Sequence, residues 1–281
     1  MVALTKDETT NLPLYDSAAE PHPFVAELRE VWRYRELVMQ WTSRNLTLRY
    51  KRSILGVFWT LLEPLLMTTV LATVFGTVFR FSLANYPVYL LSGLLAHDLF
   101  NRSINQIVAE VSTSGSLAQR IRLPRSVFAV SAVLAMLVNW SVTLVPLLGL
   151  KLILADPPTL ATLLAAPGVL LLASFALGVG LLVTTVGIRF PDFKVAFQVV
   201  LTAWFYATPI IYPLEIAPAS LRPWMVMNPL YSLIRVVRDP LYLGSSPSAA
   251  VWLAAAASSL LALVLGWWVF TRWRSTFEYT L

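Results

Sequence analysis

Cysteine is absent from this chain of 281 residues, and histidine occurs only twice, at His22 and His97. Without thiols, disulfides, iron–sulfur clusters and thiol catalysis are excluded, and two imidazoles leave little for a histidine-based metal site. The phosphate-binding pattern G-x-x-x-x-G-K-[ST] is also missing, because none of the four lysines follows a glycine. We therefore expect no metal site, no catalytic residue and no bound cofactor in this chain.

Charge is scarce as well. Charged residues make up 13% of the chain against 57% hydrophobic residues, and the mean hydropathy is +0.69, which predicts a polytopic membrane protein with one transmembrane domain. The first 25 residues lack the apolar core of a signal peptide, so residues 1–26 are expected to form a mobile cytoplasmic tail. The net charge of +6 is typical of cytoplasmic loops, and it also suits anionic lipids or a diphosphate-bearing substrate.

The sharpest change in composition lies between residues 44 and 75. Four cations, Arg44, Arg49, Lys51 and Arg52, stand just before an apolar run that begins at Ile54. Cationic flanks resist translocation, so this flank is expected on the cytoplasmic side of a first span.

Apolar runs repeat to the end of the chain. They predict an all-α protein with six transmembrane helices at about residues 57–81, 88–111, 127–154, 160–186, 195–211 and 250–270. With both termini cytoplasmic, this topology places 15 of the 21 lysines and arginines inside, as the positive-inside rule requires. The fourth span is rich in small residues, such as Gly178 and Gly180, which allow close helix packing.

Residues 27–48 predict one amphipathic helix. Val31, Val38 and Trp41 fall on one face, and arginines such as Arg29 and Arg44 fall on the other. We expect residues 27–52 to form an interface helix with a basic entrance, followed by the transmembrane domain at 53–281. Packing of this helix on a soluble partner is the alternative.

Polar residues interrupt two of the predicted spans. Thr69, Thr73 and Thr77 share one side of the first span, where they either face water or a hydroxylated ligand or bond their own backbone. Asp98 and Arg102 in the second span have the spacing of an intrahelical ion pair. Charges at that depth mark an interior or a conduit, although a purely structural pair is the alternative.

The segment from Tyr212 to about Ala249 holds six prolines, yet it is apolar enough to re-enter the membrane. We expect a hinged pair of short re-entrant helices on the outer side, between the fifth and sixth spans. Non-helical backbone at that depth requires surrounding protein or a water-filled cavity.

Several segments together resemble the transmembrane subunit of the ABC-2 type polysaccharide exporters, which move O-antigen, teichoic acid, galactan and similar glycans. The segments are WRYRELVMQWTSRNLTLRYKRSILGVFWTLLEPLL, LAQRIRLPRSVF, RFPDFK, TPIIYPLEI and NPLYSLIRVVRDPLYLG. The resemblance covers nearly the whole chain from Glu27 onward and depends on the combination. One departure is Glu63 before Pro64, where a neutral residue is expected.

The resemblance implies contacts with a separate ATPase subunit, which would bind ATP and magnesium. Two loops, about 116–125 and 187–194, are similar to the coupling elements that dock on that subunit. The residues implied in coupling are Ser116, Leu117, Gln119, Arg120, Arg122, Pro124, Arg125, Arg189 and Asp192. Plain positive-inside loops are the alternative.

The resemblance also implies a path for the substrate. By charge, the candidates for its diphosphate at the cytoplasmic entrance are Arg44, Arg49, Lys51 and Arg52. By similarity the first and fifth spans line the channel, with Trp59, Thr69, Thr73, Phe75, Trp204 and Tyr206 as candidates, and lipid-facing packing is the alternative for each aromatic. The outer gate would include Pro209, Tyr212, Pro213, Trp224 and Pro229.

The expected protein is a homodimeric permease of the bacterial cytoplasmic membrane that works with two copies of an ATPase. It is expected to export a polyprenyl-diphosphate-linked polysaccharide and to bind no nucleic acid. An ABC-2 permease for a drug or peptide is one alternative. A membrane-embedded transferase is another, but it requires paired acidic residues, whereas Glu36, Glu63 and Glu110 are scattered.

Overall fold

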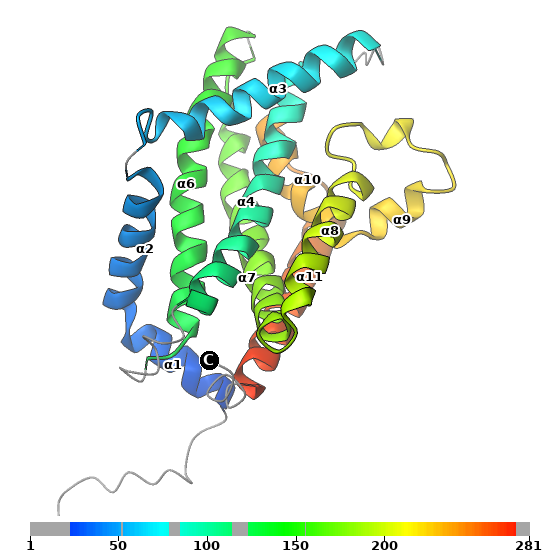
Figure 1. Cartoon of the computed structure of the whole chain (residues 1–281). Coiled ribbons are helices and arrows are strands. Elements are labelled where there is room, and N and C mark those ends of the chain that lie inside the picture. Colours follow the sequence, from blue (N-terminus) through cyan, green and yellow to red (C-terminus); the bar gives the residue numbers. More distant parts are fainter. Residues whose placement is uncertain (1–22, 52, 79–84, 114–122, 155, 274–281) are drawn as a thin grey trace, which may run out of the picture.

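The computed structural model describes residues 23–51, 53–78, 85–113, 123–154 and 156–273. These residues form a helical bundle (Figure 1), which confirms the all-α class. Its ten α-helices and two short 3-10 helices are α1 Pro23–Arg33, α2 Arg35–Tyr50, α3 Phe58–Val78, α4 Tyr86–Thr113, α6 Ser126–Ile153, η1 Leu160–Leu164, α7 Ala165–Arg189, α8 Pro191–Ala207, η2 Leu214–Ile216, α9 Arg222–Met227, α10 Pro229–Tyr242 and α11 Ala249–Arg272.

Each predicted span coincides with a helix, namely α3, α4, α6, η1 with α7, α8, and α11. In the described residues four helices are long and apolar enough to cross a membrane: Phe58–Thr77, Ser126–Ile153, Leu160–Arg189 and Ala249–Arg272. The other two fall short for different reasons. Helix α4 has 28 residues but carries several ionisable side chains, and α8 has only 17 residues. The six-span topology therefore stays a prediction.

The loop predicted at 187–194 is wrong in its extent. Helix α7 continues to Arg189 and α8 begins at Pro191, so only Phe190 separates them. Phe190 has an extended backbone, with φ −129° and ψ 90°, because the residue before a proline avoids the helical region and proline suits the first helical position. The same rule ends α8 at Ala207, four residues before the predicted end, since Thr208 precedes Pro209.

The single amphipathic helix predicted at 27–48 is also wrong, because the chain forms two helices that meet at Tyr34. Helix α1 lies across one end of the bundle, which we call the α1 end, and α2 then runs beside α6 (Figure 1). Both helices contact α6, and α1 also packs against α11. Glu27 accepts a hydrogen bond from Ser126 Oγ at 2.8 Å, whereas the Trp41 ring packs edge-on against Phe128 at 5.0 Å.

The two helices of the proline-rich segment differ in their surroundings. In α9, Trp224 and Met227 are exposed, whereas α10 lies in the core against α4, α7 and α11. The Asn228 side chain caps α10 by accepting from Leu230 N at 3.0 Å. The expected pair of short helices is present, and the apolar face of α10 buries Leu230, Leu233 and Val237. Their re-entry from the outer side stays a prediction.

The closest helix contact joins α7 and α11 at the small residues that the sequence indicates. A Cβ added to Gly178 would lie 2.2 Å from the carbonyl oxygen of Ala262, and one added to Gly266 would lie 2.1 Å from that of Gly178. Only glycine allows the two backbones to approach this closely.

We expect Gly178→Ala to lower the free energy of unfolding by about 1–3 kcal/mol, because backbone atoms must move to admit the methyl group. Thermal unfolding in detergent measures this effect. Gly149→Ala in α6 is the matched control, since nothing lies within 4 Å of its added Cβ, and it should leave stability unchanged or slightly raised. Equal melting temperatures for both variants would contradict the close contact.

Candidate functional site

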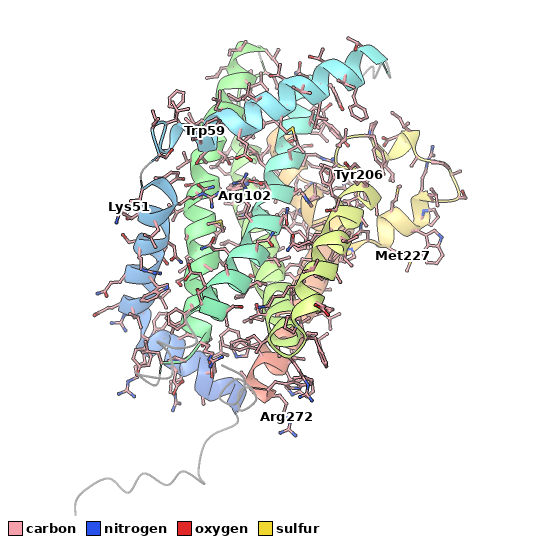
Figure 2. All side chains as sticks on the ribbon, in the orientation of Figure 1. Lys51, Trp59, Arg102, Tyr206, Met227 and Arg272 are labelled. Carbon is pink, nitrogen blue, oxygen red and sulfur yellow. The ribbon has the colours of Figure 1, made fainter. Side chains whose placement is uncertain are left out.

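A polar cavity of about 190 Å³ lies where α2, α3, α4 and α6 meet. Figure 2 shows Arg102 inside the bundle, whereas Lys51 and Trp59 lie near the turn from α2 to α3. The cavity lies midway along two long helices, because Arg102 is the 17th of 28 residues in α4 and Asn139 is the 14th of 28 in α6. Its lining consists of Arg49, Tyr50, Ser53, Gly56, Trp59, Thr60, Glu63, Pro64, Asp98, Arg102, Asn139 and Thr143.

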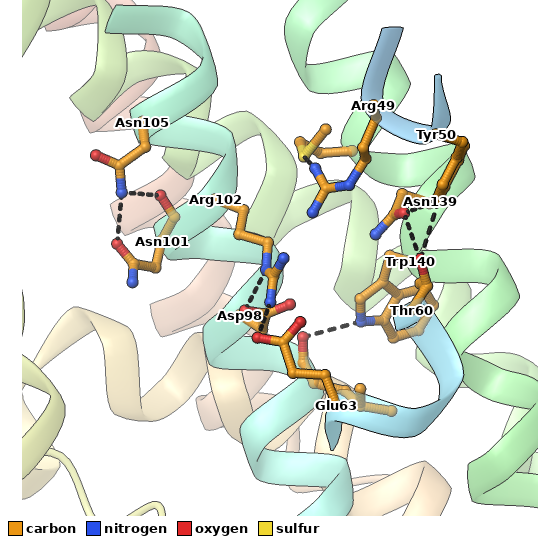
Figure 3. Close-up of polar contacts among 12 residues, drawn as sticks. Arg49, Tyr50, Thr60, Glu63, Asp98, Asn101, Arg102, Asn105, Asn139 and Trp140 are labelled. Carbon is orange, nitrogen blue, oxygen red and sulfur yellow. Dashed lines mark hydrogen bonds and ion pairs between the residues drawn. The ribbon is translucent and has the colours of Figure 1, made fainter. Parts of the chain in front are cut away.

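Arg102 joins two carboxylates from different helices on one side of the cavity (Figure 3). Its Nε lies 2.6 Å from Asp98 Oδ1, as the four-residue spacing predicts, and its Nη2 lies 2.8 Å from Glu63 Oε1 on α3. The side chains are 31% exposed for Arg102, 34% for Asp98 and 56% for Glu63. The cluster therefore borders open space and is not sealed in the core.

The opposite wall combines a hydroxyl network with a second guanidinium (Figure 3). Tyr50 Oη donates to Asn139 Oδ1 and lies 3.0 Å from Thr60 Oγ1. Arg49 Nη1 donates to the thioether sulfur of Met136 at 3.6 Å, and sulfur is a weak acceptor. Two arginines and two carboxylates thus line one cavity, together with neutral donors.

The four predicted entrance cations separate into different environments. Arg49 lines the cavity, whereas Arg44 lies over the Trp41 ring at 4.5 Å and pairs with Glu110 at 3.8 Å. Arg44 and Lys51 border a shallow hollow of about 540 Å³ on the surface of α2. Arg52 lies outside the described residues.

A polar face continues along α4 from the cavity toward the α1 end. Asn105 Nδ2 donates to Asn101 Oδ1 at 2.9 Å, and Asn105 Oδ1 accepts from Gln198 Nε2 of α8. Nearer the α1 end, Lys194 Nζ donates to Ser112 Oγ at 3.0 Å. Helix α8 is therefore attached to α4 by polar contacts.

The threonines of α3 bond their own backbone, which was the alternative left open by the sequence. The Oγ1 of Thr69 donates to Leu65 O at 2.8 Å, and that of Thr73 donates to Thr69 O at 2.7 Å. Both residues still line a second cavity of about 250 Å³ between α3, α4 and α6. Their hydroxyl oxygens retain a lone pair for a ligand.

The four aromatic channel candidates have unequal surroundings. Trp59 is 50% exposed at the first cavity, and Tyr206 is 64% exposed on α8. Phe75 instead packs against a hydrophobic cluster around Tyr89, and Trp204 packs against the rings of Phe100 and Phe175. Trp59 and Tyr206 are thus the two with rings open to a ligand.

Two of the predicted gate residues are fixed by hydrogen bonds to the bundle. Arg238 Nη1 donates to Pro209 O at 3.0 Å, and Tyr89 Oη donates to Tyr212 O at 3.0 Å. Burial raises the pKa of the Tyr212 hydroxyl. Of the others, Pro213 precedes η2, Pro229 begins α10, and Trp224 is 71% exposed on α9.

Most of the predicted coupling residues, namely Ser116, Leu117, Gln119, Arg120 and Arg122, lie outside the described residues. Pro124 is buried, and Arg125 is only 9% exposed, so these two do not offer a surface to another protein in this conformation. Arg189 and Asp192 are exposed at the α1 end, where Arg189 lies 5.6 Å from the Trp273 ring.

The sequence reasoning missed the partner of Glu63 and the roles of Tyr50 and Asn139. Glu63 and Asn139 are single polar residues within apolar runs. Such a residue does not indicate which residue on another helix it contacts. Among the residues that the structure describes, no group of three or more His, Cys, Asp or Glu is placed to hold a metal ion.

Comparison with known proteins gives a consistent assignment. The family model for ABC-2 type transporters matches residues 36–242. The chain is 31% identical to the O-antigen export system permease protein RfbA of Myxococcus xanthus, over 90% of this chain and 98% of that protein.

Two further relatives are more distant. The chain is 26% identical to an RfbA permease of Klebsiella pneumoniae, covering 73% of this chain and 79% of that protein. It is 24% identical to the polysialic acid transport protein KpsM of Escherichia coli, covering 70% and 77%. The family match over most of the chain and the near full-length similarity to one permease show that this chain belongs to the ABC-2 type transporter family.

Proposed function

We propose that this chain is the permease of an ABC exporter that moves a polyprenyl-diphosphate-linked polysaccharide across the bacterial cytoplasmic membrane. The observation that carries the proposal is the similarity to an O-antigen export permease over 98% of that protein's length. One relative is named for O-antigen export and another for polysialic acid transport, which favours a polysaccharide over a drug or peptide.

The chain is the membrane component of its transporter, and in such systems a separate ATPase binds ATP. We propose that two ATPase copies dock at the α1 end, which would then be cytoplasmic along with both termini. In sequence the basic segment 116–125 connects α4 to α6, and Arg189 and Asp192 are exposed at the α1 end. Arginines in this position would meet acidic residues of the ATPase.

We propose that two copies of the chain enclose the channel, with α3 and α8 from each copy lining it. Only 6% of the α3 span is buried in the chain, and in α8, all of whose residues are described, Leu201 alone is buried. Helices this open in one subunit have large faces available for a second copy or for substrate. Trp59 and Tyr206 would then offer rings to the apolar faces of sugars.

Deletion of the gene in its native host tests the function. We expect long-chain polysaccharide to disappear from the cell surface and to accumulate in the cytoplasm as lipid-linked chains, and we expect a plasmid copy to restore export. Surface glycan can be measured by immunoblot and intracellular chains by lipid extraction. Normal surface polysaccharide together with new sensitivity to a drug or peptide would contradict the proposal and favour the alternative permease.

A further inference from the structure

The cavity between Arg49 and Arg102 has features of a ligand site that lies deep in the bundle. Asp98 and Arg102 are 13 and 17 residues into α4, which is roughly 20 Å or more along the helix at 1.5 Å per residue. Ionisable groups at the middle of a membrane are costly unless they are paired or face water. Here they are paired and also partly exposed, so they border a polar space.

A polar face of α4 leads to this space from the α1 end. Below Asp98, toward the α1 end, the half-exposed face of α4 carries Asn101 and Asn105. Beyond Asp98, toward the opposite end, α4 is mostly buried and apolar, as at Leu91 and Leu95. A hydrophilic ligand that enters at the α1 end would therefore meet polar side chains as far as Arg102.

The donors around the cavity suit an anion. Among its contacts with described residues, Arg49 donates one hydrogen bond, to a sulfur, so its guanidinium retains most of its donor capacity. The hydroxyl of Ser53 and the Asn139 amide also line the cavity. Its volume of about 190 Å³ equals the liquid volume of roughly six water molecules, at about 30 Å³ each.

We propose that this cavity binds the phosphate group of the exported lipid-linked molecule, with Arg49 and Arg102 as its ligands and Glu63 as an internal counter-ion. This inference rests on the function proposed above. Arg102 would keep Asp98 on its own helix and exchange Glu63 for the phosphate. Glu63 is the more exposed of the two carboxylates, at 56% against 34%, so its release into water costs less.

The exchange gives Glu63 a role that the family resemblance does not supply. While no phosphate is present, Glu63 neutralises Arg102 and fastens α3 to α4. When phosphate binds, it takes over the charge-assisted hydrogen bond, and α3 loses this tie to α4. Phosphate binding would thereby be coupled to the freedom of α3 to move.

Binding measurements on the purified permease–ATPase complex in nanodiscs test the proposal, with the ATPase sites filled by a non-hydrolysable ATP analogue. The probes are farnesyl diphosphate, inorganic pyrophosphate and, as an uncharged control, farnesol. The main variant is Asp98→Asn with Arg102→Gln, which removes both charges and leaves no unpaired carboxylate on α4. Arg235→Gln with Asp239→Asn is the matched control, because it removes an equivalent i,i+4 pair whose arginine is also 31% exposed.

We expect the Asp98/Arg102 variant to bind farnesyl diphosphate about 10- to 100-fold more weakly than the wild type, since a hydrogen bond to a charged group contributes about that factor. The Arg235/Asp239 control should bind as the wild type does. Equal affinity in the Asp98/Arg102 variant, with the complex intact by size-exclusion chromatography, would overturn the site. If the Asp98/Arg102 variant binds only pyrophosphate more weakly, the ligand of the cavity is a free anion, and a lipid-linked phosphate is overturned as its source.

Glu63→Gln tests the proposal independently. It removes the carboxylate that competes with the phosphate for Arg102 and leaves the donors of Arg102 in place. We expect several-fold tighter binding of farnesyl diphosphate, and weaker binding would overturn the role of Glu63 as a displaced counter-ion. Whether each variant still binds the ATPase distinguishes failure of the phosphate site from failure of the exporter function. If the ATPase remains bound while phosphate binding is unaffected, the site fails and the exporter function stands.

Discussion

Replacing Arg120 and Arg122 together with glutamate should lower polysaccharide export at least tenfold and leave the chain folded. These arginines lie in the basic segment that we propose docks on the ATPase. Glutamates there would face acidic residues of the ATPase, and like charges at such a contact cost several kcal/mol. A cost of about 1.4 kcal/mol already weakens binding tenfold. ATP hydrolysis by the complex should no longer depend on the presence of lipid-linked glycan. Surface glycan and ATPase activity of the purified complex measure the two effects.

Arg29→Glu with Arg33→Glu is the control for this experiment. It makes the same change in net charge at the same end of the bundle, on exposed positions of α1. Export should fall much less in this variant. Equal loss of export in both variants would show that only the total positive charge matters and would contradict a specific docking role for the 116–125 segment.

Lys151→Met should destabilise the chain by about 2–3 kcal/mol, because it removes a buried ammonium group and leaves its two acceptors, the half-exposed Asp156 carboxylate and the Leu241 carbonyl, without this donor. The Lys151 side chain is 2% exposed, and its Nζ lies 2.9 Å from both Asp156 Oδ2 and Leu241 O. It thereby connects the end of α6 to the end of α10. Lys51→Met, at an exposed lysine, is the control, and thermal unfolding of both proteins in detergent gives the comparison. Equal melting temperatures for the Lys151→Met and Lys51→Met variants would contradict the role of Lys151 in connecting α6 to α10.

The helices of this protein could largely be predicted from the sequence, because each depends on a local apolar run. The points that failed depend on neighbours. The helix break at Tyr34 arises because α1 crosses the end of the bundle against α11 and the start of α6, whereas α2 runs along α6. The burial of α10, which the sequence leaves open, arises from packing against α4, α7 and α11. The burial of Lys151 in the last turn of α6 likewise depends on a neighbour, the end of α10.

The candidate site could also be predicted only where it depends on local sequence. The pairing of Asp98 with Arg102 follows from their spacing on one helix. The third member, Glu63, is 39 residues away from Arg102, and only the path of α3 across α4 brings the two together. The same holds for Tyr50 and Asn139, which lie 89 residues apart and meet because α2 runs beside α6.

The proposed function depends most directly on a separate ATPase that drives this permease. Affinity purification of the full chain in mild detergent from its native host, followed by identification of the proteins that remain bound, tests this claim. We predict recovery of a P-loop ATPase in a one-to-one ratio with the chain, consistent with two copies of each. Recovery of the chain alone, in several mild detergents and with ATP present, would contradict the motor-driven mechanism.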